Sequence, residues 1–195
     1  MNIENYIDCF FEPGISVIVV DSTSEYCPKF KIFYKYLIDK QNSTIIKENE
    51  PHYFCKNTYI IDTMNIYDIV SILKPIKNQS VFIPTSLNNW VMPISSDVVA
   101  RANHFTHAFR KFHTICTENN INLILMQNTY VSNSLPMKTL PNGMTYASNL
   151  IVTYKDELFH IIKNRFDKEK DFNIDEILQP IIKENRTKKL KRILV

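Results

Sequence analysis

The stretch from residue 79 to residue 130 constrains the fold of this chain more than any other. It opens with a short apolar run at residues 81–83 and closes with a longer apolar run at residues 121–126. Between the two runs lies a long segment with the periodicity of an amphipathic helix. Two parallel strands need a crossover connection of this kind, whereas antiparallel strands do not. We therefore predict an α/β fold with a mainly parallel central sheet flanked by helices.

The predicted long helix has one apolar face and one basic face. Ser95 or Ser96 can cap its start, and Asn119-Asn120 supplies a stop that tolerates the left-handed conformation. The apolar face is predicted to be core and consists of Val98, Ala102, Phe105, Phe109, Phe112 and Cys116. The outer face is predicted to be solvated and carries Arg101, His104, His107, Arg110 and Lys111.

The rest of the chain supplies further strands and helices. A turn signal, Pro13-Gly14, precedes a β-branched run at residues 15–20 that suits a strand buried on both faces. Pro28 can occupy the first position of a helix, where its missing N–H costs nothing. A C-terminal antiparallel hairpin is predicted from the strand patterns at residues 150–154 and 158–162. We also predict strands at residues 44–46 and 58–61 and helices at residues 65–73 and 174–182.

Glycine and cysteine usage limits the chemistry. Gly14 and Gly143 are the only glycines, and this scarcity argues against a glycine-rich phosphate loop. The four cysteines are widely separated and form no C-x-x-C pair, so we predict free thiols, no metal site and a reducing, cytoplasmic compartment. No apolar run approaches the ~18 residues that a membrane-spanning helix needs, so we expect no membrane partner.

Positive charge is concentrated at the C-terminus. The chain holds 23 Lys and Arg against 20 Asp and Glu, a net charge of +3. Residues 183–195 hold six Lys or Arg and one Glu, which amounts to +5 and leaves −2 for residues 1–182. We predict a single domain over residues 1–182 followed by a basic tail, which is either a nucleic-acid contact or a solubilising end.

Several segments resemble, in order, the core of a RecA-like recombinase, and in particular the strand-exchange branch found in phages. Residues 143–148 resemble the family's Gly-x-x-x-x-Ala-Ser segment, and residues 161–166 resemble its Val-Lys-Asn-Arg strand. The other matching segments are residues 81–83, 101–110 and 124–130. The resemblance covers residues 14–166 and implies a RecA-like core in a phage or viral protein.

The positions that hold nucleotide in that family are altered here. The resemblance aligns the phosphate loop, G-x-x-x-x-G-K-[ST], with residues 21–29, which contain no glycine and place Lys29 near the loop lysine. Pro84 stands where the family has a magnesium-associated aspartate, and proline has no carboxylate. Asn128 stands at the nucleotide-sensing position, where we predict that it only caps a strand end. We therefore predict a degenerate nucleotide site, no cofactor and no enzymatic activity.

Two segments are candidate DNA contacts. The loop at residues 131–143 matches the family's second DNA-binding loop, and the tail brings most of the positive charge. Side chains in the loop that can reach phosphates or bases are Asn133, Lys138, Thr139 and Asn142, among others. The cations of the tail proposed for the same role are Arg186, Lys188, Lys189, Lys191 and Arg192.

Three functions are consistent with these observations. The first is a non-catalytic RecA-like paralogue that acts as an accessory or structural factor in DNA recombination, repair or replication. It would be a monomer or small oligomer and bind DNA, preferably single-stranded, a RecA-type recombinase, or both. The second is a protein-interaction module, an inhibitor or scaffold, without DNA binding. The third is an active ATPase with a diverged phosphate loop, which the missing glycines and Pro84 oppose.

Overall fold

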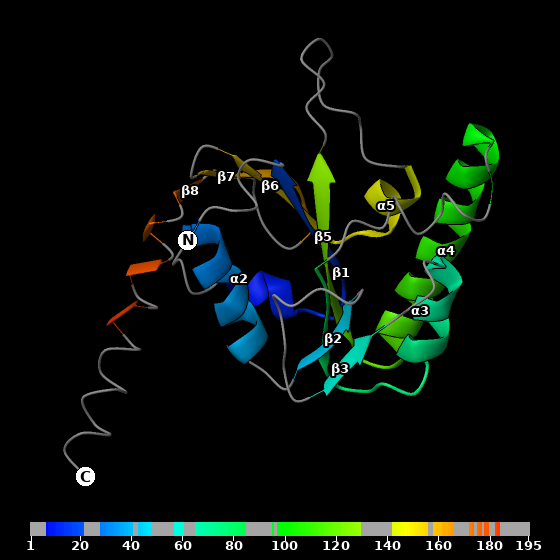
Figure 1. Ribbon diagram of the computed structural model, residues 1–195, viewed down its shortest axis with the longest axis horizontal. Helices are drawn as coiled ribbons and strands as arrows, with labels where there is room; N and C mark the ends of the chain where they lie inside the picture. Colours follow the sequence, from blue (N-terminus) through cyan, green and yellow to red (C-terminus); the bar gives the residue numbers. More distant parts are fainter. Residues whose placement is uncertain are drawn as a thin grey trace.

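The chain forms a central β-sheet with helices on both faces (Figure 1). The computed structural model describes residues 7–21, 28–40, 43–47, 57–60, 65–84, 95, 97–129, 142–155, 158–165, 172–173, 175–176, 178–179 and 182–183. The strands are β1 (Gly14–Asp21), β2 (Ser43–Lys47), β3 (Asn57–Ile60), β4 (Ser80–Ile83), β5 (Asn122–Thr129), β6 (Leu150–Lys155), β7 (Leu158–Asn164) and β8 (Phe172–Asn173). The helices are η1 (Cys9–Phe11), α2 (Pro28–Lys40), α3 (Ile66–Leu73), α4 (Val98–Glu118) and α5 (Asn142–Ala147).

The eight strands form one sheet in the order β3-β2-β4-β5-β1-β6-β7-β8. All neighbours from β3 to β6 run parallel, while β7 runs antiparallel to both β6 and β8. The mainly parallel sheet and the C-terminal antiparallel hairpin predicted from sequence are therefore both confirmed. The predicted crossover is confirmed as well, because β4 and β5, which flank α4 in sequence, pair in parallel.

The predicted apolar face of α4 is confirmed except at its N-terminal end. Four of its side chains, Phe105, Phe109, Phe112 and Cys116, are buried. Ala102 is exposed, and Ala108 is buried in its place, because the helix turns its apolar face by 3.6 residues per turn. The side chain of Val98 lies outside the described residues.

The capping prediction for α4 was wrong by one residue or two. Asp97 is the N-cap, and its Oδ1 accepts a hydrogen bond from the N–H of Ala100 at 2.7 Å. Its backbone is extended, with φ −75° and ψ 130°, as an N-cap residue requires. The helix therefore begins at Val98, one residue after the cap.

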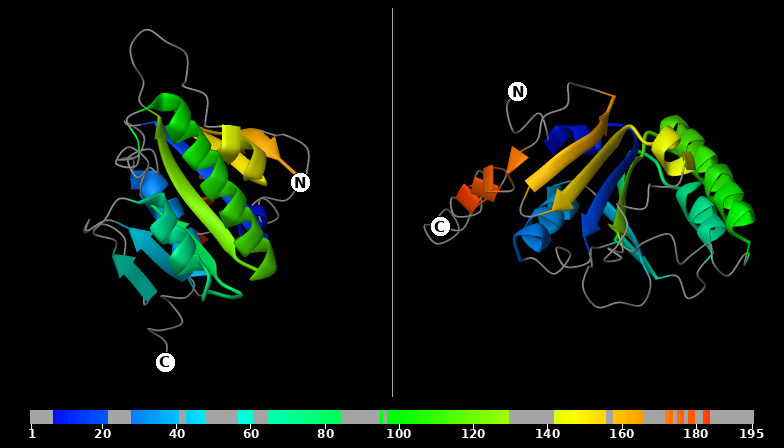
Figure 2. Two further views of the ribbon diagram at one scale, coloured as in Figure 1. Left: turned by 90° about the vertical axis from the view of Figure 1, so that its right-hand side faces the viewer. Right: turned by 90° about the horizontal axis from the view of Figure 1, so that it is seen from above.

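Strand β1 is buried on both faces, as its continuous β-branched run predicts. Ile15, Val17 and Val19 belong to the core beneath α3 and α4. Ile18 and Val20 belong to the opposite core beneath α2. This alternation follows from the period of two along a strand and divides the interior into two apolar layers, visible on either side of the sheet in Figure 2.

The core beneath α2 is built from aromatic rings. Phe30 stacks on Tyr154 of β6 with ring centroids 4.9 Å apart, and Phe33 contacts Phe159 of β7 at the same distance. Phe10 of η1 meets Phe33 edge-on at 6.0 Å. Such pairs add roughly 0.5–1.5 kcal/mol each to the burial of the rings. The hairpin is thus fastened to α2 by side chains far apart in the sequence.

Two glycines stand where a side chain would not fit. Gly14 has φ +132°, and a Cβ there would lie 2.2 Å from Nδ2 of Asn149. A Cβ on Gly143 would lie 2.5 Å from the Cα of Thr106, so α5 packs directly on the backbone of α4. Asn142 and Gly143 belong to α5, whereas the sequence prediction placed both at the end of the loop 131–143. The periodicity of a six-residue helix is too short to identify from sequence.

Cys9 and Cys116 are free and buried, as predicted, whereas Cys27 and Cys55 lie outside the described residues. Burial raises the pKa of the Cys116 thiol to about 12. Within the described ranges, no helix is long and apolar enough to cross a membrane. The last helix predicted, at residues 174–182, is present where the structure describes it, because residues 175–176, 178–179 and 182–183 are helical.

Candidate functional site

The carboxyl ends of β4, β5 and β1 lie side by side at one edge of the sheet (Figure 1). Asp21 at the end of β1 is in register with Thr129 of β5, and Ile83 at the end of β4 is in register with Leu125. In open α/β sheets, ligands bind outside such strand ends. We call this place the strand-end site, and it includes Pro84, Asn128 and the start of α2, which follows β1.

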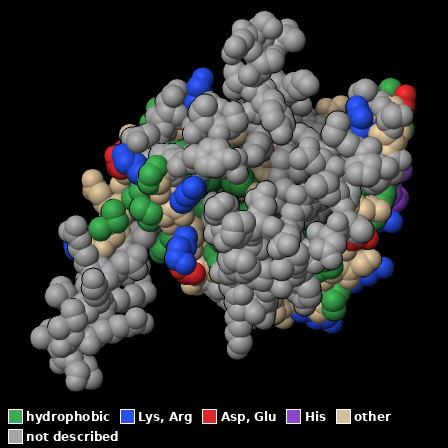
Figure 3. All heavy atoms as spheres, in the orientation of Figure 1, with side chains coloured by type: hydrophobic (Ala, Val, Ile, Leu, Met, Phe, Trp, Pro, Cys, Tyr) green, Lys and Arg blue, Asp and Glu red, His purple; other side chains and the backbone are tan. Residues whose placement is uncertain are grey.

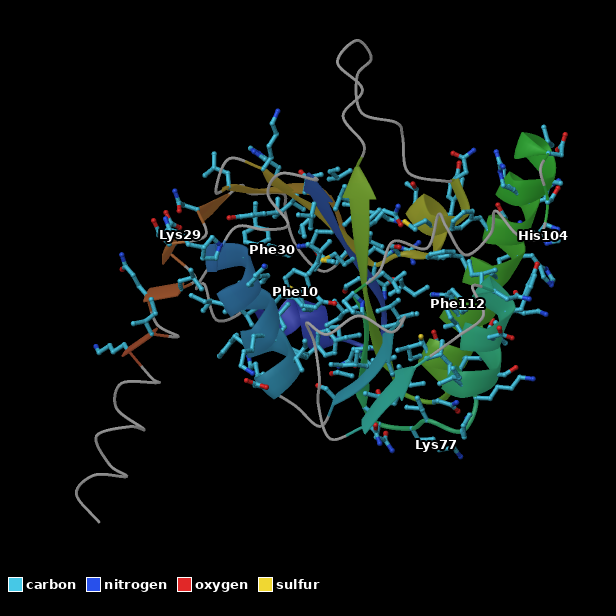
Figure 4. The ribbon with its side chains drawn as sticks, in the orientation of Figure 1. Phe10, Lys29, Phe30, Lys77, His104 and Phe112 are labelled. Atoms are coloured by element: carbon cyan, nitrogen blue, oxygen red, sulfur yellow. The ribbon has the colours of Figure 1, made fainter. Side chains whose placement is uncertain are left out.

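The start of α2 is committed to contacts within the chain. Pro28 is the first residue of the helix and has no N–H to offer an anion. Nζ of Lys29 lies 3.0 Å from Oδ2 of Asp175 and forms an ion pair with it. Figure 4 labels Lys29 beside the C-terminal segment that carries this carboxylate. The lysine that the sequence aligned near a phosphate-binding position therefore has a carboxylate as its partner.

The end of β4 is apolar. Pro84 is buried directly after Ile83, and the whole strand is buried. Asn128 lies in β5 next to the strand end, but its side chain lies outside the described residues. Gln127 precedes it and is buried, with 2% of its surface exposed. Sequence reasoning passed over this glutamine, although a polar residue directly after the apolar run at residues 121–126 was the available signal.

The predicted DNA-binding residues lie almost entirely outside the described residues. These are Asn133, Lys138 and Thr139 of the loop, and Arg186, Lys188, Lys189, Lys191 and Arg192 of the tail. Asn142 alone is described, and it is exposed at the start of α5. The DNA contacts at the loop and tail therefore stay predictions.

A second site, absent from the sequence-based candidates, lies on the outer face of α4. Two grooves flank this helix. One has a volume of about 520 Å³ and is lined by Val70, Lys74, His107, Arg110, Lys111, Thr114 and Ile115. The other has a volume of about 480 Å³ and is lined by Thr106, Arg110, His113, Thr114, Gly143, Tyr146, Ala147 and Arg165. Arg110 and Thr114 stand on the ridge between them. The sequence showed this basic face but not the hollows beside it, because α3 and α5 form their far walls.

Tyr67 of α3 fastens α3 to the basic face of α4. Its hydroxyl lies 2.8 Å from Nδ1 of His104, and Nζ of Lys111 lies 5.6 Å from the centre of its ring. Partial burial raises the pKa of the Tyr67 hydroxyl. Among the residues that the structure describes, no three His, Cys, Asp or Glu side chains are grouped as metal ligands. His104 is thus engaged with a phenol.

Two cations from the end of β7 close the C-terminal end of α5. Nζ of Lys163 donates hydrogen bonds to the carbonyl oxygens of Thr145 and Tyr146. Nη2 of Arg165 donates to the carbonyl of Tyr146 at 2.8 Å, and its Nη1 donates to Oδ1 of Asn149 at 3.2 Å. Desolvation, and then the charge of Arg165, lower the pKa of Lys163. The two cations satisfy carbonyls that α5 leaves open and complement its dipole.

The fold defined by these strands and helices is RecA-like. The chain is similar to the solved ATPase domain of a helicase with a RecA-like fold, with a TM-score of 0.54 over 82% of this chain and 80% of that one. The two sequences are 9% identical over the match, so the similarity shows the fold and does not extend to activity. No family model and no curated protein sequence matches the chain.

Proposed function

We propose that the protein is a non-catalytic RecA-like paralogue that acts as an accessory or structural factor in DNA recombination, repair or replication. It would bind DNA, a RecA-type partner, or both. The observation that carries the proposal is the state of the strand-end site. Where a RecA-like ATPase would hold nucleotide, the described residues are Pro28, Lys29 paired with Asp175, and buried Pro84.

The ion pair of Lys29 supports the loss of phosphate binding. An anion at this position would have to compete with the carboxylate of Asp175 for the same ammonium group. Both side chains are partly exposed, at 36% and 50%, so the pair itself adds only about 0–1 kcal/mol to stability. Its importance lies in geometry, because it directs Lys29 toward residue 175 instead of toward the strand ends.

Pro84 supports the loss of metal binding. A magnesium ion bound with a nucleotide is usually held through one or two carboxylates, and Pro84 offers no side-chain oxygen. It is also buried, so the space directly after β4 is filled by an apolar ring. The described residues of the strand-end site therefore do not fit magnesium-ATP. Residues 22–27, which connect β1 to α2, lie outside the described ranges.

Nucleotide binding tests the non-catalytic part of the proposal. The melting temperature of the full chain should not change when magnesium-ATP is added. A true ligand at about 100 times its Kd would stabilise the fold by ~2.7 kcal/mol, which is easily detected. Lys29→Ala is the matched variant, and it should leave the response to nucleotide unchanged. A rise in melting temperature that Lys29→Ala abolishes would contradict the proposal and favour an ATPase with a diverged loop.

DNA binding tests the remaining part. A labelled single-stranded oligonucleotide should bind the full chain with an affinity that falls as salt is raised. Engagement of three or four cations should give a log–log slope of about −3. Changing Lys188, Lys189 and Lys191 of the tail to Glu should then weaken binding. Absence of binding at low salt would remove the DNA part of the proposal and favour a protein-interaction module on the same fold.

A further inference from the structure

The outer face of α4 carries positive charge over most of its length. From Val98 to Thr117 the helix contains no Asp or Glu. The acidic residues nearest in sequence are Asp97 at the N-cap and Glu118 in the last turn. In Figure 3, Lys, Arg and His side chains recur along the edge of the molecule where Figure 1 places α4. The helix therefore presents cations that no carboxylate on its own turns can neutralise.

Four exposed side chains of the larger groove define what we call the α4 basic surface. They are Lys74, at the end of α3, and His107, Arg110 and Lys111, on α4. Within the described ranges, none of the three cations among them forms an ion pair; the recorded pairs are Lys29–Asp175, Lys35–Asp39 and Lys40–Asp8. Lys111 lies over the ring of Tyr67, which positions its stem and leaves its charge without a counter-ion.

The groove has the shape to hold an anionic chain. Its volume of about 520 Å³ lies between Lys74 on one wall and Arg110 and Lys111 on the other. Val70 and Ile115 supply apolar surface between these walls. The Thr114 hydroxyl donates to the carbonyl of Arg110, so the cations, and not this hydroxyl, are the donors available to a ligand.

We propose that the α4 basic surface binds the phosphodiester backbone of a nucleic acid. The proposal rests on the DNA-binding part of the proposed function and adds a contact outside the loop 131–143 and the tail. Interfaces with nucleic acid are far more positively charged than interfaces with protein. Protein interfaces instead use apolar and aromatic anchors and contain few lysines. Val99 is the large hydrophobic side chain exposed on the described part of α4, and it lies two turns from the groove. The surface thus has the chemistry of a phosphate contact.

Charge reversal on the ridge tests the proposal. The double variant Arg110→Glu/Lys111→Glu is compared with Lys31→Glu/Lys155→Glu, which makes the same change in net charge at two exposed positions elsewhere. Binding of a labelled single-stranded oligonucleotide to each full chain is followed by fluorescence anisotropy across a salt series. Loss of two phosphate contacts should weaken binding at least about tenfold at low salt and make the log–log slope shallower by about 1.4. The control pair should retain the wild-type slope.

Each outcome decides between the surface and the other contacts. A slope that becomes shallower only in the Arg110/Lys111 variant supports the surface. If the tail variant Lys188→Glu/Lys189→Glu/Lys191→Glu loses binding and the Arg110/Lys111 variant does not, the surface is wrong and the DNA function stands. Equal loss in the control pair would reduce the effect to net charge and overturn the surface. Absence of binding by the wild type would overturn both. Arg110→Gln/Lys111→Gln serves if circular dichroism shows that the Glu variant is unfolded.

A protein ligand is the remaining alternative, and competition tests it. Polyglutamate carries carboxylates in place of phosphates on a flexible chain. It should displace the oligonucleotide only at a much higher concentration of charge, because Arg binds phosphate through paired hydrogen bonds. Displacement at equal concentrations of charge, lost in the Arg110/Lys111 variant, would overturn the proposal and identify an acidic protein segment as the ligand class.

Discussion

Helices α2 and α4 cover opposite faces of one sheet, yet they use their charged residues differently (Figure 1). On α2, Lys29, Lys35 and Lys40 each form an ion pair, with Asp175, Asp39 and Asp8 respectively. On α4, none of the cations has a carboxylate partner within the described ranges. The charges of α2 are therefore used within the chain, and those of α4 remain available to a ligand. Two helices of similar amphipathic pattern can thus differ in function through their outer faces alone.

The two inner faces, in contrast, should be equally important for stability. Phe33 of α2 and Phe109 of α4 are both fully buried. Truncating either to Ala should lower the free energy of unfolding by about 3–5 kcal/mol, the usual cost of removing a large core side chain. Urea unfolding measures the change. Ile32→Ala, at a half-exposed position of α2, is the control and should cost below about 1 kcal/mol. A small loss from one phenylalanine alone would mean that its helix is not packed as described.

The close packing of α5 on α4 distinguishes the α4 face from the α2 face. Gly143→Ala places a Cβ 2.5 Å from the Cα of Thr106, which is backbone and cannot rotate away. The overlap should outweigh the roughly 1 kcal/mol gained in helix propensity and leave a net loss of about 1–2 kcal/mol. The midpoint of thermal unfolding reports this loss. Asn142→Ala, at the exposed neighbouring position, should be nearly neutral, so an equal effect of both variants would refute the clash.

Capping sharpens the description of where α4 begins. Asp97→Ala removes the side chain that accepts from the N–H of Ala100 and should cost about 1 kcal/mol. Ser95 was a cap candidate from sequence, but its Oγ accepts from the N–H of Asp97, outside the helix. Ser95→Ala should therefore cost less than Asp97→Ala in the same urea titration. The reverse order would restore the sequence-based assignment.

The fold was predictable because its signals are local and repeated. The β-branched run of β1, the alternation of β6 and β7 and the long stripe of α4 each specify an element by periodicity. The choice of Asp97 over Ser95 or Ser96 was not predictable, since all three are good caps and tertiary packing selects among them. The site was predictable only in part. Lys29 could be placed at the start of a helix, but its partner Asp175 is 146 residues away.

The grooves beside α4 show the same limit. The sequence identifies the cations of the outer face by their spacing within one helix. It does not reveal that Lys74 stands opposite Arg110 across a groove, because that relation depends on how α3 packs against α4. Arg165 reaches the second groove from the end of β7 for the same reason. A surface assembled from several elements is a property of the fold.

The smallest expected effect tests the comparison of the outer faces most directly. Lys35 and Asp39 lie 3.5 Å apart, with 71% and 59% of their side chains exposed. Such a pair stabilises a helix by about 0.3–0.5 kcal/mol at low salt. At about 1 M salt the screening length falls to ~3 Å, so Lys35→Ala should be destabilising at low salt and nearly neutral at high salt. Arg110 has no such partner, and Arg110→Ala should show no salt-dependent loss of stability. Guanidinium cannot be the denaturant because it is itself a salt, so the measurement is urea unfolding at two concentrations of sodium chloride. A salt-dependent loss in Arg110→Ala as large as that in Lys35→Ala would reveal a carboxylate partner within the chain. The charge of the α4 basic surface would then be used internally, as the charges of α2 are, and the difference between the two helices would disappear.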